Sequence, residues 1–215
     1  MSDILRQVDE DLRKDRLLRI WKLYRVYIVG FVLIALISLA SYEYYLFNTK
    51  SKNEMIVQEY ISAINSTDKN AAISQLIELD ESSNAYIKGL AKLKRAELYF
   101  AAEKRDVALE LLESISRDES LNEIIRDLAL YKYLMLQLDI LDKDLYIQII
   151  DSKHLEGSKF KYHFKELKAL KLLINGNQND SIEVFNSIID NEDSPIDLKK
   201  RSEKFKKTLQ WWKII

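Results

Sequence analysis

The sequence has no Cys, one Pro and four Gly among its 215 residues. Without Cys the chain has no disulfide, no thiolate metal site and no cysteine nucleophile. Average usage would give roughly 25 Gly and Pro residues, so sandwiches, barrels and glycine-loop nucleotide folds are disfavoured. A formal net charge of −1 gives no reason to expect nucleic acid as a partner. With 47% apolar residues, the chain is predicted to be ordered and mostly helical.

A run of seventeen residues without a charge, 26–42, lies between Arg25 and Glu43. Its ten strongly apolar side chains contribute on the order of −3 to −6 kcal/mol to membrane insertion. A spanning helix needs ~20 residues, and the apolar flanks, with Lys22 reaching the headgroups, supply the difference. The sequence therefore predicts a transmembrane helix over 26–42. The aromatic residues expected at its two membrane interfaces are Trp21, Tyr24, Tyr42, Tyr44 and Tyr45.

The distribution of Lys and Arg predicts the orientation of this helix. Seven precede the run and two follow it within residues 43–62. Because positive flanks stay in the cytoplasm, we expect residues 1–25 there and a domain over 43–215 on the other side of the membrane. The expected topology determinants nearest the span are Arg13, Lys14, Arg16, Arg19, Lys22 and Arg25.

Two other interpretations of the run exist. Ser38-Leu39-Ala40 would satisfy the rule for a signal-peptide cleavage site, although the run exceeds the usual length of a signal core and five acids precede it. A core helix of a soluble protein would need protein on every side, because the run is apolar on every face. A permanent anchor is the favoured interpretation.

The first 25 residues have helical spacing of their own. Ile4, Leu5, Val8 and Leu12 form one apolar stripe. This segment is predicted to be an amphipathic helix that lies at the membrane surface or contacts a cytoplasmic partner.

Beyond the span, helix is predicted to continue to about Ile64 without a breaker. Further helices are predicted at 69–79, 83–103, 105–116, 120–138, 143–151, 158–175, 179–190 and 195–213. A small or medium-sized residue, followed four positions later by a large apolar residue, recurs at 72/76, 108/112, 145/149 and 181/185. These spacings of 36, 37 and 36 indicate an array of helical hairpins, each burying its apolar stripe against its neighbours.

The unit that begins at Ala96 fits the tetratricopeptide pattern best. It has, in order, a small residue, Tyr, a second small residue, Ala and a large apolar residue. A second unit has the same spacing. The sequence thus predicts an all-α fold, a single transmembrane helix followed by a degenerate tetratricopeptide-like helical-hairpin solenoid. The residues expected to pack within the repeats are Ala72, Leu76, Ala96, Tyr99, Ala102, Ala108 and Leu112, then Ala169, Leu172, Gly176, Ser181 and Phe185.

The chain offers little that resembles a catalytic or metal site. Its two histidines, His154 and His163, are nine residues apart, which is not the spacing of a helical ligand pair. Ser66-x-x-Lys69 resembles a serine–lysine acylase motif but is expected by chance in a chain with this much Ser and Lys. Paired acids such as Asp142 and Asp144 stand at helix starts and are predicted to cap. We expect no enzyme, no cofactor, no metal and no small-molecule substrate.

The opening from Met1 to Arg16, followed by Leu18-Arg-Ile-Trp21-Lys-Leu-Tyr24, one span and tetratricopeptide-like repeats, resembles the membrane-anchored ancillary subunit of the bacterial Sec translocon, the YfgM-like group. The resemblance implies a single-pass inner-membrane protein whose periplasmic helical domain associates with the SecYEG translocon and with periplasmic chaperones. It transfers no site residue.

The expected function is that of a non-catalytic adaptor at the translocon. Its partners would be the lipid bilayer, translocon subunits, periplasmic chaperones and translocating polypeptides. The alternative is an envelope scaffold or signalling regulator that sequesters a cytoplasmic partner through residues 1–25.

Overall fold

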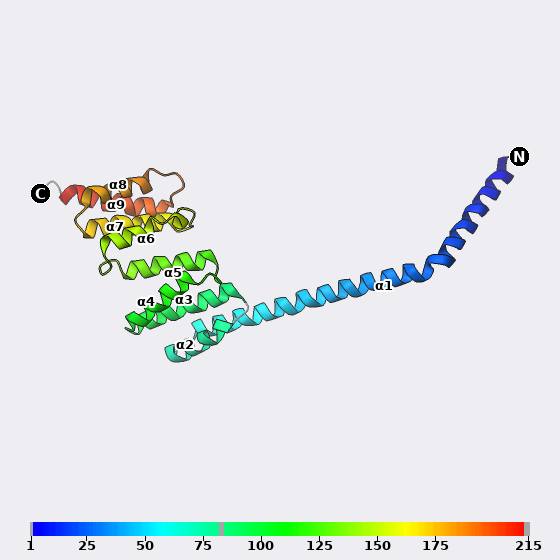
Figure 1. Ribbon diagram of the computed structural model, residues 1–215, viewed down its shortest axis with the longest axis horizontal. Helices are drawn as coiled ribbons and strands as arrows, with labels where there is room; N and C mark the ends of the chain where they lie inside the picture. The colour runs from blue at the N-terminus through cyan, green and yellow to red at the C-terminus, as the bar shows by residue number, and fades with distance from the viewer. Residues whose placement is uncertain (1, 82–83, 213–215) are drawn as a thin grey trace. The chain divides into compact units, whose positions relative to one another are not determined.

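The fold was obtained as a computed structural model (Figure 1). It describes the backbone of residues 2–81 and 84–212, and the side chains of 21–27, 29–81, 84–152 and 155–209. Every regular element in this part of the chain is a helix, and none is a strand. The chain divides into two units, Met1–Met55 and Ile56–Ile215.

The described residues of the first unit, 2–55, are all helical. Helix α1, Ser2–Ile64, runs through it and ends within the second unit. Residues 2–64 contain no Pro and only one Gly, Gly30. One Gly in a helix costs about 1 kcal/mol relative to Ala, which is too little to end a helix of this length. The predicted continuation of helix to about Ile64 is confirmed.

The second unit contains the end of α1 and the helices that follow it. Their bounds are α2 Lys69–Glu78, η1 Leu79–Glu81, α3 Ala85–Ala101, α4 Arg105–Arg117, α5 Glu123–Leu136, α6 Lys143–Ile150, η2 Lys153–Glu156, α7 Lys161–Ile174, α8 Gln178–Ile189 and α9 Ile196–Trp212. Each predicted helix beyond residue 64 is present, with ends within three residues of the expectation.

Short polar side chains begin several of these helices. The side-chain oxygens of Asp68, Asn84, Asn122 and Asp142 each accept hydrogen bonds from the backbone N–H groups of the first helical turn. These N–H groups have no partner inside the helix. The capping role expected for Asp142 is confirmed: its Oδ1 accepts from the amides of Asp144 and Leu145 at 2.9 and 3.1 Å.

Helices α3 and α7 end in the same way. After α7, Gly176 has φ of 79°, its N–H donates to Leu173 O, and the N–H of Asn177 donates to Leu172 O. After α3, Glu103 has φ of 60°, its N–H donates to Phe100 O, and the N–H of Lys104 donates to Tyr99 O. Both are Schellman motifs. Glu103, and not Ala102, therefore occupies the position of Gly176.

Neighbouring helices of the second unit pack in sequence order. Helices α3 and α4, α4 and α5, α7 and α8, and α8 and α9 form the main contacts, and α6 packs on α7. The odd-numbered helices also touch one another, α3 with α5, α5 with α7, and α7 with α9. Figure 1 shows these helices stacked beside one another. We call α3, α5, α7 and α9 the odd row.

The core of this unit is divided into four clusters that follow one another along the chain. They lie around Leu76 at α1–α3, around Ile115 at α3–α5, around Tyr146 at α5–α7, and around Phe185 at α7–α9. Each fully buried large side chain contributes about 1.5–3 kcal/mol. The last three clusters each join one odd-row helix to the next, and the first joins the end of α1 and α2 to α3.

Candidate interaction surface

One helix in the described part of the chain is long and apolar enough to cross a membrane, and it contains the predicted span. A core helix would bury its side chains, but those described within 26–42 are exposed; Val26 is 71% and Phe31 74% exposed. The coarse prediction of one candidate span near the N-terminus is confirmed by length and composition.

The residues predicted at the membrane interfaces all lie on α1 with exposed side chains. These are Trp21, Tyr24, Tyr42, Tyr44 and Tyr45. Lys22 and Arg25 are exposed as well. The side chains of Arg13, Lys14, Arg16 and Arg19 lie outside the described residues, so their role in topology stays a prediction.

The predicted repeat residues lie mainly in the core. Leu76, Ala108, Ala169, Ser181 and Phe185 are fully buried, and Ala72, Ala96 and Leu112 nearly so. Tyr99 is half-buried, Ala102 is exposed, and Gly176 directly follows Asn175, the C-cap residue of α7. Positions 73 residues apart correspond: Ala96 with Ala169, Glu103 with Gly176, and Leu112 with Phe185 (96 to 169, 103 to 176, 112 to 185). Where Ala108 corresponds to Ser181, the serine hydroxyl donates to Ala169 O at 2.8 Å.

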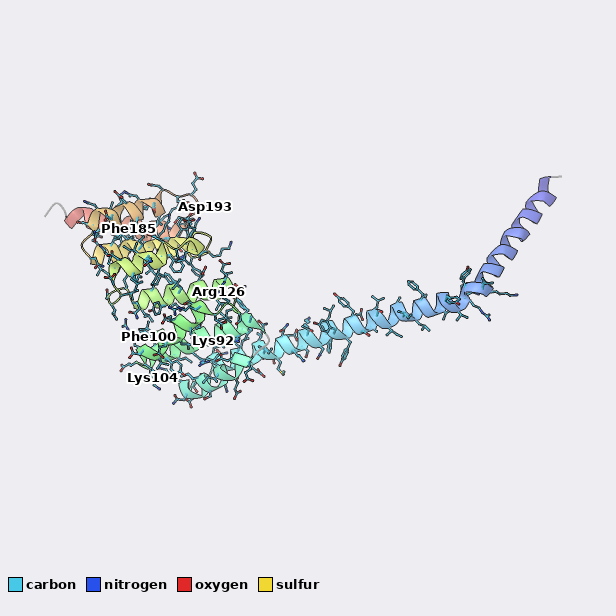
Figure 2. The ribbon with its side chains drawn as sticks, viewed as in Figure 1. Lys92, Phe100, Lys104, Arg126, Phe185 and Asp193 are labelled. Atoms are coloured by element: carbon cyan, nitrogen blue, oxygen red, sulfur yellow. The ribbon has the colours of Figure 1, made fainter. Side chains whose placement is uncertain are left out.

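Two adjoining hollows lie along α3 and α5, one beside the end of α1 and the other beside α4. One has a volume of about 210 Å³ and apolar walls from Leu90, Leu93 and Leu128. The other, about 110 Å³, is walled by Phe100, Met135 and other apolar residues. Figure 2 labels Phe100 on α3. Both hollows are lined by Glu97 and Lys132, and we call them together the Glu97 groove.

An ion network lies at the centre of the Glu97 groove. The Glu97 carboxylate accepts from Lys132 at 2.8 Å and from Lys94 at 3.1 Å. Burial alone would raise the pKa of Glu97, but the hydrogen bonds from Lys132 and Lys94 outweigh it and lower the pKa overall. Because two ammonium groups share one carboxylate, the floor of the groove keeps a net positive charge between apolar walls.

Aromatic and ionic contacts continue along the odd row from α5 to α9. Tyr131 on α5 meets His163 on α7 edge-on, with ring centroids 5.7 Å apart, and Phe160 lies equally close to His163. One turn further along α7, the buried Glu166 accepts two hydrogen bonds from Arg201 of α9, at 2.8 and 2.6 Å. Hydrogen bonding to Glu166 raises the pKa of Arg201 above its usual value.

The environment of His163 is that of a packed side chain. Burial lowers the pKa of His163; nearby Glu166 opposes this and Arg201 adds to it. Its Nδ1 is buried and has no hydrogen-bond partner among the described residues. The side chain of His154 lies outside the described residues.

The sequence interpretation did not pair Glu97 with Lys132 or Glu166 with Arg201. A signal was present: each acid–base pair is separated by 35 residues, close to the repeat period. Side chains one repeat apart on neighbouring odd-row helices face each other, so an acid followed by a base at this distance predicts such a bridge.

No cluster of three or more His, Cys, Asp or Glu suited to a metal ion occurs among the described side chains. In comparisons with known proteins, no family model, curated protein or solved structure matches the chain. The candidate site is consequently defined by its own geometry, an apolar groove with an ionic centre on the odd row.

Proposed function

We propose that this protein is a non-catalytic adaptor anchored in the bacterial inner membrane by the span at 26–42. Residues 1–25 lie in the cytoplasm, and a periplasmic tetratricopeptide-like solenoid binds chaperones or polypeptides emerging from the Sec translocon. The observation that carries the proposal is the Glu97 groove. It offers apolar walls and a fixed positive floor, which suit a polypeptide segment with apolar and acidic side chains better than a small polar substrate.

Three features support the solenoid. Core clusters succeed one another along the chain, as expected when each hairpin is buried only by its neighbours. Packing positions and the Schellman ends of α3 and α7 recur 73 residues apart, which is two repeat periods (103 to 176). Salt bridges link successive odd-row helices one period apart.

Site-specific photo-crosslinking tests the adaptor function. A photoreactive amino acid replaces Met135, which lines the Glu97 groove, or Val107 on α4, which does not. The two side chains are 47% and 44% exposed, so the variants differ in place and not in accessibility. We expect translocon or chaperone subunits to crosslink to position 135 in cells and to co-purify, while position 107 gives background.

The proposal fails if neither position captures a translocon or chaperone component above background. Equal capture at both positions would show that the Glu97 groove is not the binding site. Deleting residues 1–25 while keeping an equivalent anchor distinguishes the alternative, because a regulator that sequesters a cytoplasmic partner would lose its effect and a periplasmic adaptor would keep its crosslinks.

A further inference from the structure

Another hollow of the second unit lies away from the Glu97 groove. It has a volume of about 550 Å³, between the end of α6, the first turns of α7 and the turn from α8 to α9. Figure 2 marks that turn with Asp193. Three lysines of α7 spaced along one face, Lys161, Lys165 and Lys168, line this hollow, which we call the lysine pocket.

Only one of these lysines is neutralised by a described side chain. Lys168 donates to both carboxylate oxygens of Asp151, at 2.8 and 2.6 Å. Lys161 and Lys165 form no ion pair with any described side chain, and their ammonium nitrogens lie 4.8 and 5.8 Å from the centre of the Tyr162 ring. Glu156 is the only other charged residue in the lining. The pocket therefore keeps an excess of positive charge.

The walls of the lysine pocket are fixed by buried groups. Tyr162 is 5% exposed, and its hydroxyl donates to Asn191 Oδ1 at 2.7 Å. That oxygen also accepts from the backbone N–H of Asp193 at 3.0 Å, so the NH₂ group of Asn191 remains as a donor. Leu155 and Phe164, both almost fully buried, give the pocket an apolar floor. The pocket combines a rigid apolar floor with cations that have no ion-pair partner among the described side chains. This combination suits ligand binding better than a solvated helix face would.

We propose that the lysine pocket binds an acidic segment of a polypeptide. Carboxylates of the segment would pair with Lys161 and Lys165, and an apolar side chain between them would lie on the floor formed by Leu155 and Phe164. This combination of charge and apolar surface matches an acidic peptide. The site is separate from the Glu97 groove, so the inference stands or falls independently of the adaptor function.

A phosphate group fits the pocket less well. Phosphate is best held by the forked guanidinium of Arg or by free backbone N–H groups at a helix start. The lining contains no Arg. The N–H groups of Phe160 and Lys161, the first at this end of α7, already donate to Ser158. Asp151 and Glu156 would repel a densely charged anion.

Fluorescence anisotropy tests the inference with the full chain in neutral detergent. The probe is a fluorescein-labelled peptide of alternating Glu and Leu. We expect it to bind the wild-type protein and to bind Lys161→Gln/Lys165→Gln roughly tenfold more weakly, through loss of two partly exposed charge contacts. Lys161→Arg/Lys165→Arg should keep binding. The matched control, Lys69→Gln/Lys104→Gln, removes two exposed lysines near α2 and α4 and should bind like wild type.

The outcomes against the inference are equally specific. Equal weakening by the two glutamine pairs, or equal binding of a Gln–Leu peptide, would show that Lys161 and Lys165 do not select carboxylates. Phosphatidylglycerol vesicles or inorganic phosphate that bound through these lysines, without binding of the Glu–Leu peptide, would assign the pocket to phosphate and overturn the inference. Circular dichroism checks that each variant is folded, and Lys165→Gln alone replaces the pair if the pair is not.

Discussion

Glu103 is the only non-glycine residue with positive φ among the described residues. Its backbone takes the left-handed conformation that the Schellman end of α3 requires, where side chains other than Gly are strained by about 1–2 kcal/mol. Gly176 fills the same position after α7 without that strain. The sequence predicts the end at Gly176, because Gly is the usual residue there. The break after residue 103 was also predicted, but the left-handed conformation of Glu103 within it was not.

Glu103→Gly should stabilise the protein by about 0.5–1 kcal/mol, because relief of left-handed strain exceeds the added entropy of the unfolded chain. Urea unfolding of the full chain followed by circular dichroism measures the change. Gly176→Ala should destabilise by a similar amount for the opposite reason. Glu103→Ala removes the same carboxylate but keeps a Cβ, so stabilisation of this variant would show that strain is not the cause.

His163 should make stability depend on pH. Burial lowers its pKa in the folded protein, whereas the unfolded chain takes up a proton at about pH 6.5. As pH falls through that value, the unfolded state binds more protons than the folded state, so stability decreases until the lowered folded pKa is passed. His163→Phe keeps an aromatic ring beside Tyr131 and Phe160 and should remove this decrease.

The urea midpoint of unfolding, measured at about pH 7 and at about pH 5.5, reports this effect. Both pH values lie above the range in which carboxylates titrate. Glu97 does not interfere, because its pKa is lowered. The other histidine gives the comparison: if His154→Gln and not His163→Phe removed the pH dependence, the assignment to His163 would be wrong.

At the scale of elements, the approach of α3 to α5 depends on Gly89. A methyl group placed at Gly89 would lie 2.6 Å from Ile125 Cγ2. Ile125 is a β-branched residue in the core cluster of α3–α5, so its side chain has few alternative rotamers. The absence of a side chain at position 89 therefore lets these two odd-row helices meet.

Gly89→Val should destabilise the protein by about 1–3 kcal/mol through overpacking. Gly157→Val is the matched control, because no described atom lies within 4 Å of a Cβ at that position, and its effect should stay within about 0.5 kcal/mol. Urea unfolding compares the two. Ile125→Ala in the Gly89→Val background should recover part of the loss; no recovery would show that the contact is not limiting.

The helices themselves were predictable, and the contacts between them were only partly so. Polar caps such as Asp68 and Asp142 and the apolar spacing mark the helix ends locally, within a few residues of sequence. The Glu97–Lys132 and Glu166–Arg201 bridges join residues on different helices, and local periodicity does not show which exposed side chains converge. The lysine pocket was missed for the same reason, since Tyr162 and Asn191 meet only after folding.

At the scale of the whole molecule, the span should decide where the chain resides. Leu33→Lys/Ile37→Lys places two charges within the run, each costing about 2.5–3.5 kcal/mol at a helix centre. The total exceeds the favourable contribution of the run, so we expect the variant to be extracted by alkaline carbonate and the wild type to stay with membranes. Val107→Lys/Ile124→Lys adds the same charge on exposed helix positions. Extraction of that control as well would show general instability.

The orientation of the span makes a separate prediction. A reporter that functions only in the periplasm should be active when fused to the C-terminus of the wild-type chain, because seven positive residues precede the run and two follow it. Replacing the residues at 13–25 that carry positive charge with Gln should reduce this activity. Activity of a reporter that functions only in the cytoplasm, fused to the wild-type C-terminus, would show that the topology is the opposite of the predicted one.

The division of the core into four successive clusters also determines how the second unit comes apart. A chain with one shared centre melts as a whole, whereas here the outermost hairpin at either extremity loses only one set of neighbours when it frays. Amide exchange should accordingly be quickest at α9 and slowest around Ile115 and Tyr146. Local unfolding of the last helix would leave the Glu97 groove intact, so this architecture tolerates loss of structure at its C-terminal end.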